Sequence, residues 1–326
     1  RELYFQGMES VYLFSSGTLK RKANTICLET ESGRKYIPVE NVMDIKVFGE
    51  VDLNKRFLEF LSQKRIPIHF FNREGYYVGT FYPREYLNSG FLILKQAEHY
   101  INQEKRMLIA REIVSRSFQN MVDFLKKRKV RADSLTRYKK KAEEASNVSE
   151  LMGIEGNARE EYYSMIDSLV SDERFRIEKR TRRPPKNFAN TLISFGNSLL
   201  YTTVLSLIYQ THLDPRIGYL HETNFRRFSL NLDIAELFKP AVVDRLFLNL
   251  VNTRQINEKH FDEISEGLML NDEGKSLFVK NYEQALRETV FHKKLNRYVS
   301  MRSLIKMELH KLEKHLIGEQ VFGSEE

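Results

Sequence analysis

The spacing of apolar residues changes once along the chain, near residue 90, and this change constrains the fold more than any other sequence feature. Before it, short segments rich in β-branched and aromatic residues alternate with turn-forming residues such as Gly17, Gly33 and Gly75. After it, apolar residues recur three and four positions apart, which is the spacing of amphipathic helices. The sequence therefore predicts an α+β protein with a small N-terminal β-sheet domain followed by a larger all-α C-terminal domain.

The same change of spacing sets the expected domain boundaries. Residues 1–7 resemble the remnant of an engineered protease-cleavage tag, so Met8 is the expected native start. The β domain is assigned to residues 8–85 and the α-helical domain to residues 86–326. Strand edges and aromatic surface in the first domain predict a two-fold symmetric homodimer formed largely through that domain.

Local patterns also predict individual elements. In the first domain, strands are expected at Val11–Phe14, Thr25–Leu28, Tyr36–Val39, Asp44–Val47, Ile66–Phe71 and Tyr76–Phe81, with one helix over Leu53–Gln63. In the second domain, one long helix or two nearly collinear ones are expected over 91–130. Further helices are expected at Val148–Val170, Asn187–Gln210, Ile234–Asn252 with a break at Pro240, Phe261–Glu266 and Gly274–Leu316.

Charge and composition narrow the class of protein. Lys and Arg number 52 against 44 Asp and Glu, a net charge of +8, and basic runs fall at 126–131, 137–141 and 174–183. Three runs so close together favour a phosphate-binding surface over solvated helix ends. The single cysteine, Cys27, excludes an internal disulfide framework and a cysteine-built zinc site. No unbroken apolar stretch spans a bilayer and no secretion signal follows Met8, so a cytoplasmic protein is expected.

Glu155 is the first candidate for chemistry because glycines flank it at 153 and 156. Two glycines in a helix cost about 2 kcal/mol together and need a reason to be there. One interpretation is a bare strip beside the carboxylate, where a substrate backbone can approach. The other is a tight helix–helix crossing with Glu155 in a local salt bridge. Spacing alone leaves both open.

Two further segments supply polar residues in apolar surroundings. His221 ends the segment 213–221, and a lone histidine of this kind is more often structural than a ligand. Asp233 and Glu236 would share one helix face, three positions apart, among leucines and an isoleucine. A Glu, a His and a Glu or Asp from three segments suit a divalent ion with oxygen-rich coordination, which favours Mn²⁺ or Mg²⁺ over structural zinc.

Four motifs, in this order, resemble the CRISPR-associated adaptation integrase, the Cas-one family. The motifs are Leu-Met-Gly-Ile-Glu-Gly-Asn-Ala-Arg-x-x-Tyr-Tyr at 151–163, Arg-Arg-Pro-Pro at 182–185 followed by Asn190, Leu-Asp-Pro-x-Ile-Gly-x-x-His at 213–221, and Ser-Leu-x-Leu-Asp-x-x-Glu-x-Phe-Lys-Pro at 229–240. The resemblance extends over nearly the whole chain from Met8. It implies the same order of a β domain and an α-helical domain.

The resemblance implies the following roles. Glu155, His221 and Glu236 would be catalytic and would bind Mn²⁺ or Mg²⁺, with other polar residues near the site: Asp233, Lys239, Arg159 and Asn190. Some members carry a tyrosine where Phe195 stands, so no role for that hydroxyl is expected here. The implied function is insertion of prespacer DNA into a CRISPR repeat array by transesterification, together with cleavage of branched DNA. Homodimers would bridge to a small second CRISPR-associated protein, Cas-two, and DNA contacts are expected at Arg182, Arg183, Lys126, Lys127, Lys139 and Lys140.

Two rival interpretations use part of the same sequence. Arg216 and His221 match the short Arg-x4-6-His signature of helical, metal-independent ribonucleases, but this signature leaves Glu155 and Glu236 unexplained. A non-catalytic DNA-bridging module would explain the basic runs but not the acidic residues placed among apolar ones. Metal dependence separates the integrase from the ribonuclease, and strand transfer separates it from the bridging module.

Overall fold

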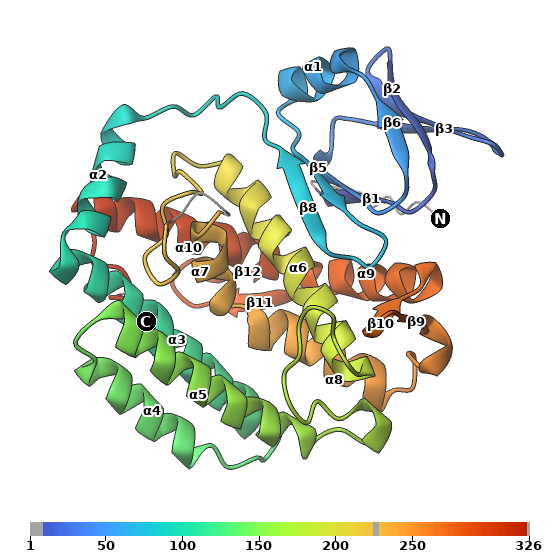
Figure 1. Ribbon diagram of the computed structural model, residues 1–326. Coiled ribbons are helices and arrows are strands. Elements are labelled where there is room, and N and C mark those ends of the chain that lie inside the picture. The colour runs from blue at the N-terminus through green and yellow to red at the C-terminus, as the bar shows by residue number, and fades with distance from the viewer. Residues whose placement is uncertain (1–8, 224–227, 325–326) are drawn as a thin grey trace. The chain divides into compact units, whose positions relative to one another are not determined.

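The computed structural model describes residues 9–223 and 228–324, and the chain divides into two compact units (Figure 1). The first unit runs to Tyr86 and also contains residues 259–264 and 269–280. The second contains residues 87–258, 265–268 and 281–326. The predicted fold class is confirmed, since the N-terminal part is built on β-sheets and the C-terminal part is mostly helical.

The first unit contains two four-stranded sheets. One has the order β1-β5-β7-β8 and comprises Glu9–Leu13, Val42–Val47, Ile68–Phe71 and Tyr77–Phe81, with β1, β5 and β7 parallel and β8 antiparallel to β7. The other has the order β4-β3-β2-β6 and comprises Gly33–Pro38, Thr25–Thr30, Gly17–Lys22 and Val51–Leu53. Both sheets and helix α1 (Lys55–Lys64) contribute to one apolar core that includes Val11, Leu19, Ile45 and Phe60.

The opposite face of the β1-β5-β7-β8 sheet carries a group of polar residues that we call the sheet cluster: Ser10, Asp44, Lys46 and His69, which are buried, and Thr80, which is half-buried. Lys46 Nζ lies 3.1 and 3.3 Å from the two carboxylate oxygens of Asp44 and 2.9 Å from Ser10 Oγ. His69 Nε2 lies 3.5 Å from Asp44 Oδ2, and His69 Nδ1 lies 2.7 Å from Thr80 Oγ1. Alternation along each strand places these side chains together, because their neighbours Ile45 and Val47 face the apolar core.

Helices dominate the second unit. They are α2 (Gly90–Ile101), α3 (Gln103–Lys126), α4 (Asp133–Glu144), α5 (Val148–Asp167), α6 (Phe188–Tyr209), α7 (Leu230–Glu236), α8 (Arg245–Asn252), the end of α9 (Asp272–Arg287) and α10 (Met301–Leu316), with short 3₁₀ helices at Glu173–Phe175 and Glu258–His260. Of the two alternatives predicted over 91–130, the structure has two helices, α2 and α3. They meet at Asn102, whose side chain accepts a hydrogen bond from Lys105 N and so starts α3.

Helix α6 is the central helix of this unit. Within the described residues it alone has the length and apolar character of a membrane-spanning helix, and 83% of its most apolar window is buried inside the protein. The sequence prediction considered only unbroken apolar runs, which polar residues such as Asn197 and Ser198 interrupt here. Burial on all sides explains why α6 is apolar around its whole circumference.

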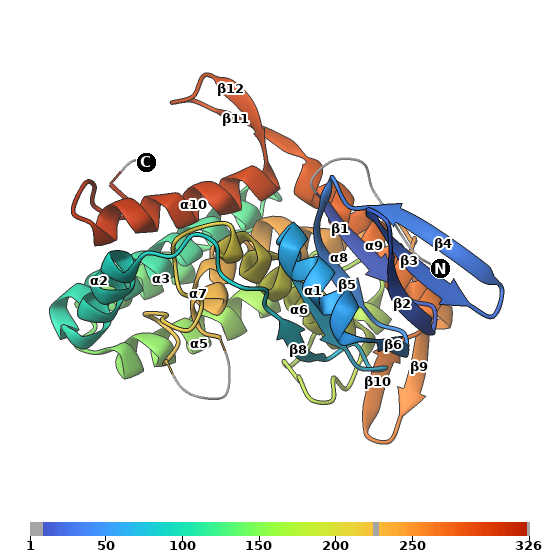
Figure 2. The same ribbon diagram turned by 90° about the horizontal axis from the view of Figure 1, so that it is seen from above.

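Two predicted elements are wrong in the C-terminal part. Residues predicted as a helix at Phe261–Glu266 form strand β9 (Phe261–Ile264), which pairs with β10 (Gly267–Leu270). The helix predicted over Gly274–Leu316 is interrupted by the hairpin of β11 (Thr289–His292) and β12 (Arg297–Ser300) (Figure 2). The break predicted at Pro240 is confirmed, because a turn and a π-helical segment, Pro240–Asp244, separate α7 from α8.

Candidate active site

Two of the predicted carboxylates are joined by a single arginine. Glu155 lies in α5, and Arg159 follows one turn later on the same face. The Arg159 guanidinium donates from Nε to Glu155 Oε1 at 2.6 Å and from a terminal nitrogen to Glu236 Oε2, at the end of α7, at 2.5 Å. The structure thus brings Glu155 and Glu236 together through Arg159, and we call these residues with Lys239 the carboxylate–arginine cluster.

Lys239 neutralises the second oxygen of Glu236. Its Nζ donates to Glu236 Oε1 at 2.7 Å and lies 5.1 Å from the centre of the Tyr201 ring. Burial alone would raise the pKa of Glu236, but the charges of Lys239, Arg159 and His221 outweigh burial and lower it to about 2. Glu236 is therefore a carboxylate at neutral pH.

His221 is oriented by Asp233. Asp233 Oδ1 accepts hydrogen bonds from the backbone N–H of His221 at 2.8 Å and from its ring Nδ1 at 2.7 Å. Asp233 Oδ2 accepts from the backbone N–H groups of Tyr219 and Leu220 at 2.5 and 3.0 Å. Because a carboxylate only accepts, Nδ1 carries a proton, and in the neutral ring Nε2 keeps its lone pair for a ligand. The motif at 213–221 predicted His221 as a site residue, and the hydrogen bond to Asp233 sets its tautomer.

The glycines beside Glu155 border open space. A Cβ atom built at Gly153 or Gly156 would meet nothing within 4 Å in the described part of the chain. The tight helix–helix crossing is therefore wrong, although the local salt bridge that went with it is present as the Glu155–Arg159 pair. The side chain of Glu155 is only 12% exposed. Gly153 and Gly156 form an open strip on the exposed face of α5, whereas Glu155 lies on the buried face with Arg159.

The donor set suits a hard divalent ion under one condition. Within residues 9–223 and 228–324, no three His, Cys, Asp or Glu side chains are grouped closely enough to hold an ion. Arg159 instead lies between the two carboxylates. The available donors are two carboxylates and an imidazole with its Nδ1 proton held by Asp233, a combination typical of Mn²⁺ or Mg²⁺ sites. The residues fit such an ion if Arg159 releases at least one carboxylate.

Asp244 adjoins this region, and the sequence analysis missed it. Its Oδ2 accepts from Tyr162 OH at 2.8 Å, whereas its buried Oδ1 has no hydrogen-bond partner. Burial raises the pKa of Asp244 to about 6, against the opposing charge of Arg159. One terminal nitrogen of Arg159 is also buried without a partner. A lone acid among Val242, Val243 and other apolar residues was the available sequence signal.

Asn190 lies apart from the carboxylates and organises a loop. Its side-chain oxygen accepts from an Arg180 nitrogen at 2.5 Å and from Thr181 N at 3.1 Å. Its side-chain nitrogen donates to the carbonyl oxygens of Ile177 and Lys179. Asn190 thus holds the segment that leads to Arg182 and Arg183, both of which are exposed.

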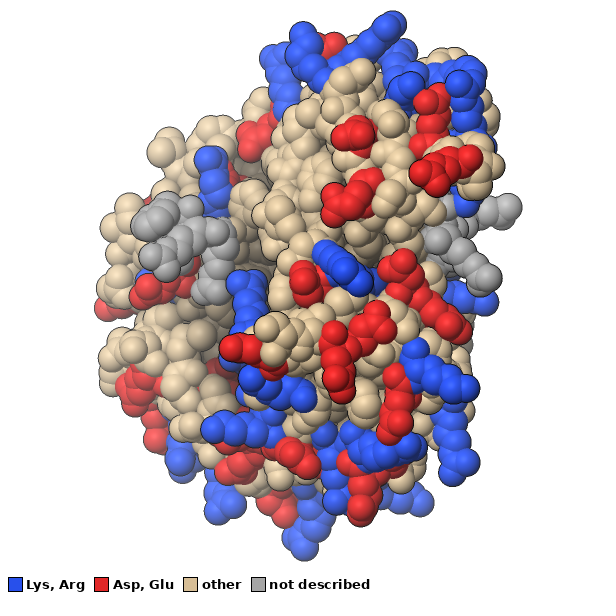
Figure 3. All heavy atoms as spheres, turned by 45° about the vertical axis from the view of Figure 1, so that its right-hand side comes forward, with Lys and Arg blue, Asp and Glu red and all other residues tan. Residues whose placement is uncertain are grey.

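The other predicted DNA-contacting lysines are mostly at the surface. Lys126, Lys127 and Lys140 are exposed, whereas Lys139 is half-buried and donates to Gln119 Oε1 at 3.3 Å. On the face drawn in Figure 3, basic side chains are interspersed with acidic ones and do not form one continuous patch. The rival pair has separate acidic partners, because Arg216 is bound by Asp214 at 2.6 Å while His221 is bound by Asp233.

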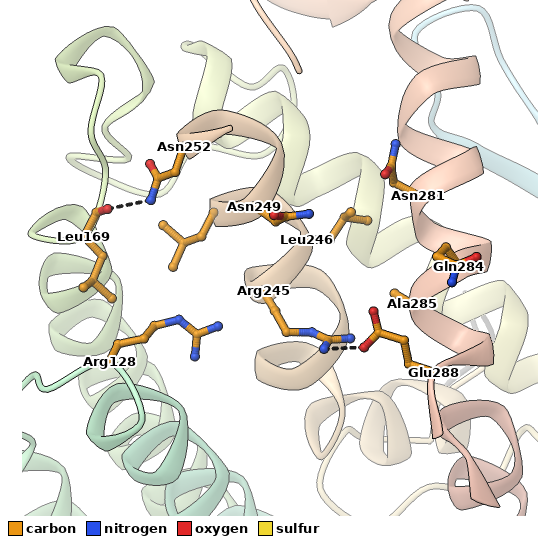
Figure 4. Close-up of a pocket in the computed structure, with 11 residues that line it drawn as sticks. Arg128, Leu169, Arg245, Leu246, Asn249, Asn252, Asn281, Gln284, Ala285 and Glu288 are labelled. Atoms are coloured by element: carbon orange, nitrogen blue, oxygen red, sulfur yellow. Dashed lines mark hydrogen bonds and ion pairs between the residues drawn. The ribbon is translucent and has the colours of Figure 1, made fainter. Parts of the chain in front are cut away.

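A cavity of about 490 Å³ lies elsewhere in the helical unit (Figure 4). Arg245 and Glu288 form an ion pair of 2.5 Å in its wall, and Asn252 donates to the Leu169 carbonyl oxygen at 2.9 Å. Carboxamide side chains and Arg128 contribute much of the remaining lining. None of the residues of the carboxylate–arginine cluster lines this cavity.

Comparison with known proteins gives a consistent family. Residues 11–284 match the family described as CRISPR associated protein Cas1. A relative named CRISPR-associated endonuclease Cas1 2, from Thermodesulfovibrio yellowstonii, is 52% identical over 96% of this chain and 97% of its own length. The solved structure of a CAS1 protein from Thermotoga maritima is 97% identical, covers 98% of this chain and 100% of its own, and superimposes with a TM-score of 0.93.

More distant solved structures share the fold alone. A casposase bound to integration product is 19% identical with a TM-score of 0.86, over 96% of this chain and 92% of its own. A chain of a Cas6-RT-Cas1–Cas2 complex is 21% identical with a TM-score of 0.83, over 98% of this chain and 36% of its own.

Proposed function

Because the chain belongs to the Cas1 family of CRISPR-associated proteins, we propose that it is a DNA endonuclease and integrase of CRISPR spacer acquisition. The observation that carries the proposal is the carboxylate–arginine cluster, in which Glu155 and Glu236 share Arg159. Cleavage and insertion both transfer a phosphoryl group between oxygens, and such chemistry needs charge stabilisation where a DNA backbone can approach.

Each residue of the site would have a separate role. Glu155 and Glu236, 12% and 7% exposed, would face an approaching phosphodiester. Asp233 holds His221 with its Nε2 available as a ligand or acceptor. Lys239 remains on Glu236 and limits the negative charge that would repel an incoming phosphate.

Glu155, His221 and Glu236 would hold a Mn²⁺ or Mg²⁺ ion. When bound, such an ion polarises a phosphoryl oxygen and lowers the pKa of a coordinated hydroxyl. Arg159 would then leave at least one of its two carboxylates. A guanidinium freed in this way can donate two parallel N–H groups to a phosphate, so Arg159 would change from a bridge between carboxylates to a substrate contact.

DNA would be held by the exposed basic residues and positioned by the loop that Asn190 organises. Contacts of this kind to phosphates fix register without reading sequence. The protein would act as a homodimer formed through residues 8–85, together with the small partner Cas2. Family membership supports the partner, and the name of one fold neighbour records a complex that contains Cas2. A cytoplasmic location accompanies this proposal, because the CRISPR array is chromosomal DNA.

The proposal is tested by strand transfer on a supercoiled plasmid that carries CRISPR repeats. We expect labelled prespacer DNA to be joined to the repeat boundary in the presence of Mn²⁺ and Cas2, with no joining in EDTA. Glu155→Ala should abolish joining and cleavage of branched DNA while leaving DNA affinity nearly unchanged. Cleavage at the wild-type rate by Glu155→Ala in EDTA would overturn the metal mechanism and favour the Arg216–His221 ribonuclease interpretation.

A further inference from the structure

The hairpin of β11 and β12, which we call the arm, extends away from the helices of its own unit (Figure 2). Its base is well anchored. Val299 is buried, Met301 N donates to the Glu288 carbonyl oxygen at 2.9 Å, and Glu288 is ion-paired with Arg245. The arm is therefore a defined projection whose outer part is available to a partner.

The outer part of the arm exposes aromatic and aliphatic side chains. Tyr298 is 69% exposed and Phe291 is 50% exposed, and their ring centres lie 5.4 Å apart in an edge-to-face arrangement. Val290 and Leu295 are also exposed. Residues this apolar rarely gather at a projecting tip unless something binds there.

The charge of the arm is of one sign. Residues 289–300 contain Lys293, Lys294 and Arg297 and no Asp or Glu. A purely apolar protein partner would bury Lys293 and Arg297 without supplying an opposite charge, which is unfavourable. A polyanion would instead bind these two cations with release of counterions.

Strand register separates the two kinds of side chain. Phe291 lies opposite Tyr298, so their rings share one face of the ribbon, while His292 and Arg297 pair on the other face. Lys293 and Lys294 lie in the turn that joins the strands. Flat apolar rings bordered by cations match the two parts of an unpaired nucleotide, its base and its phosphate.

We propose that the arm binds an unpaired stretch of DNA, with bases stacked on Phe291 and Tyr298 and phosphates facing the basic residues of the turn and of β12. Bases within a duplex keep their faces covered by their neighbours, so only unpaired nucleotides or a frayed end can stack on the rings. This inference rests on the proposed function, since it supplies a DNA-contacting element for the same enzyme. The arm would guide a single-stranded end, separately from the carboxylate–arginine cluster.

The test compares two arm variants with matched controls in the full-length protein. Phe291→Ser/Tyr298→Ser removes the rings, and Lys293→Gln/Arg297→Gln removes charge. Leu94→Ser and Lys314→Gln are the controls, because both residues are exposed helical positions of the same unit away from the arm. Thermal unfolding of all variants checks that each is folded.

Binding is measured by fluorescence anisotropy on a duplex with a 3′ single-stranded overhang and on a blunt duplex, each over a range of salt. Loss of the rings should weaken overhang binding about five- to a hundred-fold and blunt-duplex binding by less than about two-fold. It should also abolish the quenching of 2-aminopurine placed in the overhang. Loss of two charges should lower the salt slope by about 1.4.

The outcomes separate the arm from the enzyme. If the ring variant binds the overhang as the wild type does, while the wild type cleaves and joins DNA, the arm proposal fails and the proposed function stands. If the ring variant changes only self-association or capture of Cas2, the arm is a protein-binding element and the proposal is overturned. A wild-type protein that neither binds nor cleaves DNA overturns both.

Discussion

The protein contains two groups of buried charges, and they differ in how completely they are closed. In the sheet cluster of the first unit, Asp44, Lys46 and His69 are fully buried, at 0% exposed. In the carboxylate–arginine cluster of the second unit, Glu155, Arg159 and Glu236 are 7–12% exposed and remain partly accessible to solvent. Both groups pair opposite charges, so charge pairing alone does not distinguish a structural cluster from a candidate site.

The two clusters differ in how the fold assembles them and in whether their buried polar atoms have hydrogen-bond partners. The sheet cluster is assembled by register, since Ser10 pairs with Asp44 across β1 and β5 and Lys46 pairs with His69 across β5 and β7. The carboxylate–arginine cluster draws on α5, α7 and the turn after α7, and one buried nitrogen of its Arg159 lacks a partner. An unpaired buried polar atom is costly, so this cluster is less completely satisfied than the sheet cluster.

The largest effect on stability is expected in the sheet cluster. Lys46→Met should lower the free energy of unfolding by about 3–5 kcal/mol, because it leaves the Asp44 carboxylate buried beside His69 without its main counter-charge. Burial would raise the pKa of Asp44, and the Lys46 charge lowers it well below its ordinary value. Urea unfolding measures the change. The matched control, Lys55→Met at an exposed position, should change stability by less than about 0.5 kcal/mol. Equal losses of stability in the two variants would show that the sheet cluster does not stabilise the fold.

Glu155→Gln should lower catalytic activity far more than stability. We expect DNA cleavage to fall by at least about a hundred-fold, equivalent to about 3 kcal/mol in the barrier, with unfolding altered by much less. The amide keeps the shape of Glu155 but loses the charge that faces Arg159. Glu160→Gln, exposed on the same helix, should retain wild-type cleavage. A Glu155→Gln protein that unfolds readily but still cleaves would place this cluster with the structural one.

Asp244 should make stability depend on pH in a recognisable direction. Burial raises its pKa from 3.8 to about 6, so between these values the folded protein binds the proton more tightly than the unfolded chain. Its contribution is fully present near pH 4 and is lost as pH rises through 6. Asp244→Asn resembles the protonated form, so its stability relative to the wild type should improve by about 2–3 kcal/mol between pH 4 and pH 7. Urea unfolding of both proteins across this range tests it, and a pH-independent difference would contradict it.

The smallest effect concerns the open strip. Gly156→Ala should stabilise α5 by about 0.5–1 kcal/mol, since alanine is the better helix former and the new methyl group meets no described neighbour. Cleavage should stay within about two-fold of the wild type, because Gly156 lies on the exposed face of α5 and Glu155 on the buried face. Gly90→Ala, at the start of α2 and equally open, should likewise leave cleavage unchanged. A loss of cleavage in Gly156→Ala alone would show that the strip contacts DNA.

Local spacing predicted much of the fold because it depends on neighbours in sequence. The alternation in β5 and the helical period of α5 and α6 are of this kind. Strand β2 was missed because Lys20, Arg21 and Lys22 are polar, although its pairing with β3 and β6 makes it a strand. The arm was missed because no glycine or proline marks its turn; Asn296, with φ of 49°, takes the left-handed conformation instead.

The site was predictable as a set of residues but not as an arrangement. The motifs named Glu155, His221 and Glu236, and the four-residue spacing of Glu155 and Arg159 permits a salt bridge within one helix. The second bond of Arg159, to Glu236, joins residues 77 positions apart and depends on how α5 and α7 pack. Neither motif nor spacing contains that information, and the same holds for the contact between Tyr162 and Asp244.

The discontinuous first unit has a consequence for synthesis of the protein. Residues 259–264 and 269–280 belong to it, and Lys275, buried in this unit, donates to the Arg73 carbonyl oxygen. At about 5–20 residues per second, a ribosome needs roughly 10–40 s to pass from Tyr86 to these segments. During that interval the β-sheets of the first unit have been synthesised, but residues 259–264 and 269–280 have not. The first unit to emerge is thus among the last to be completed, and the helical unit is largely synthesised in the meantime.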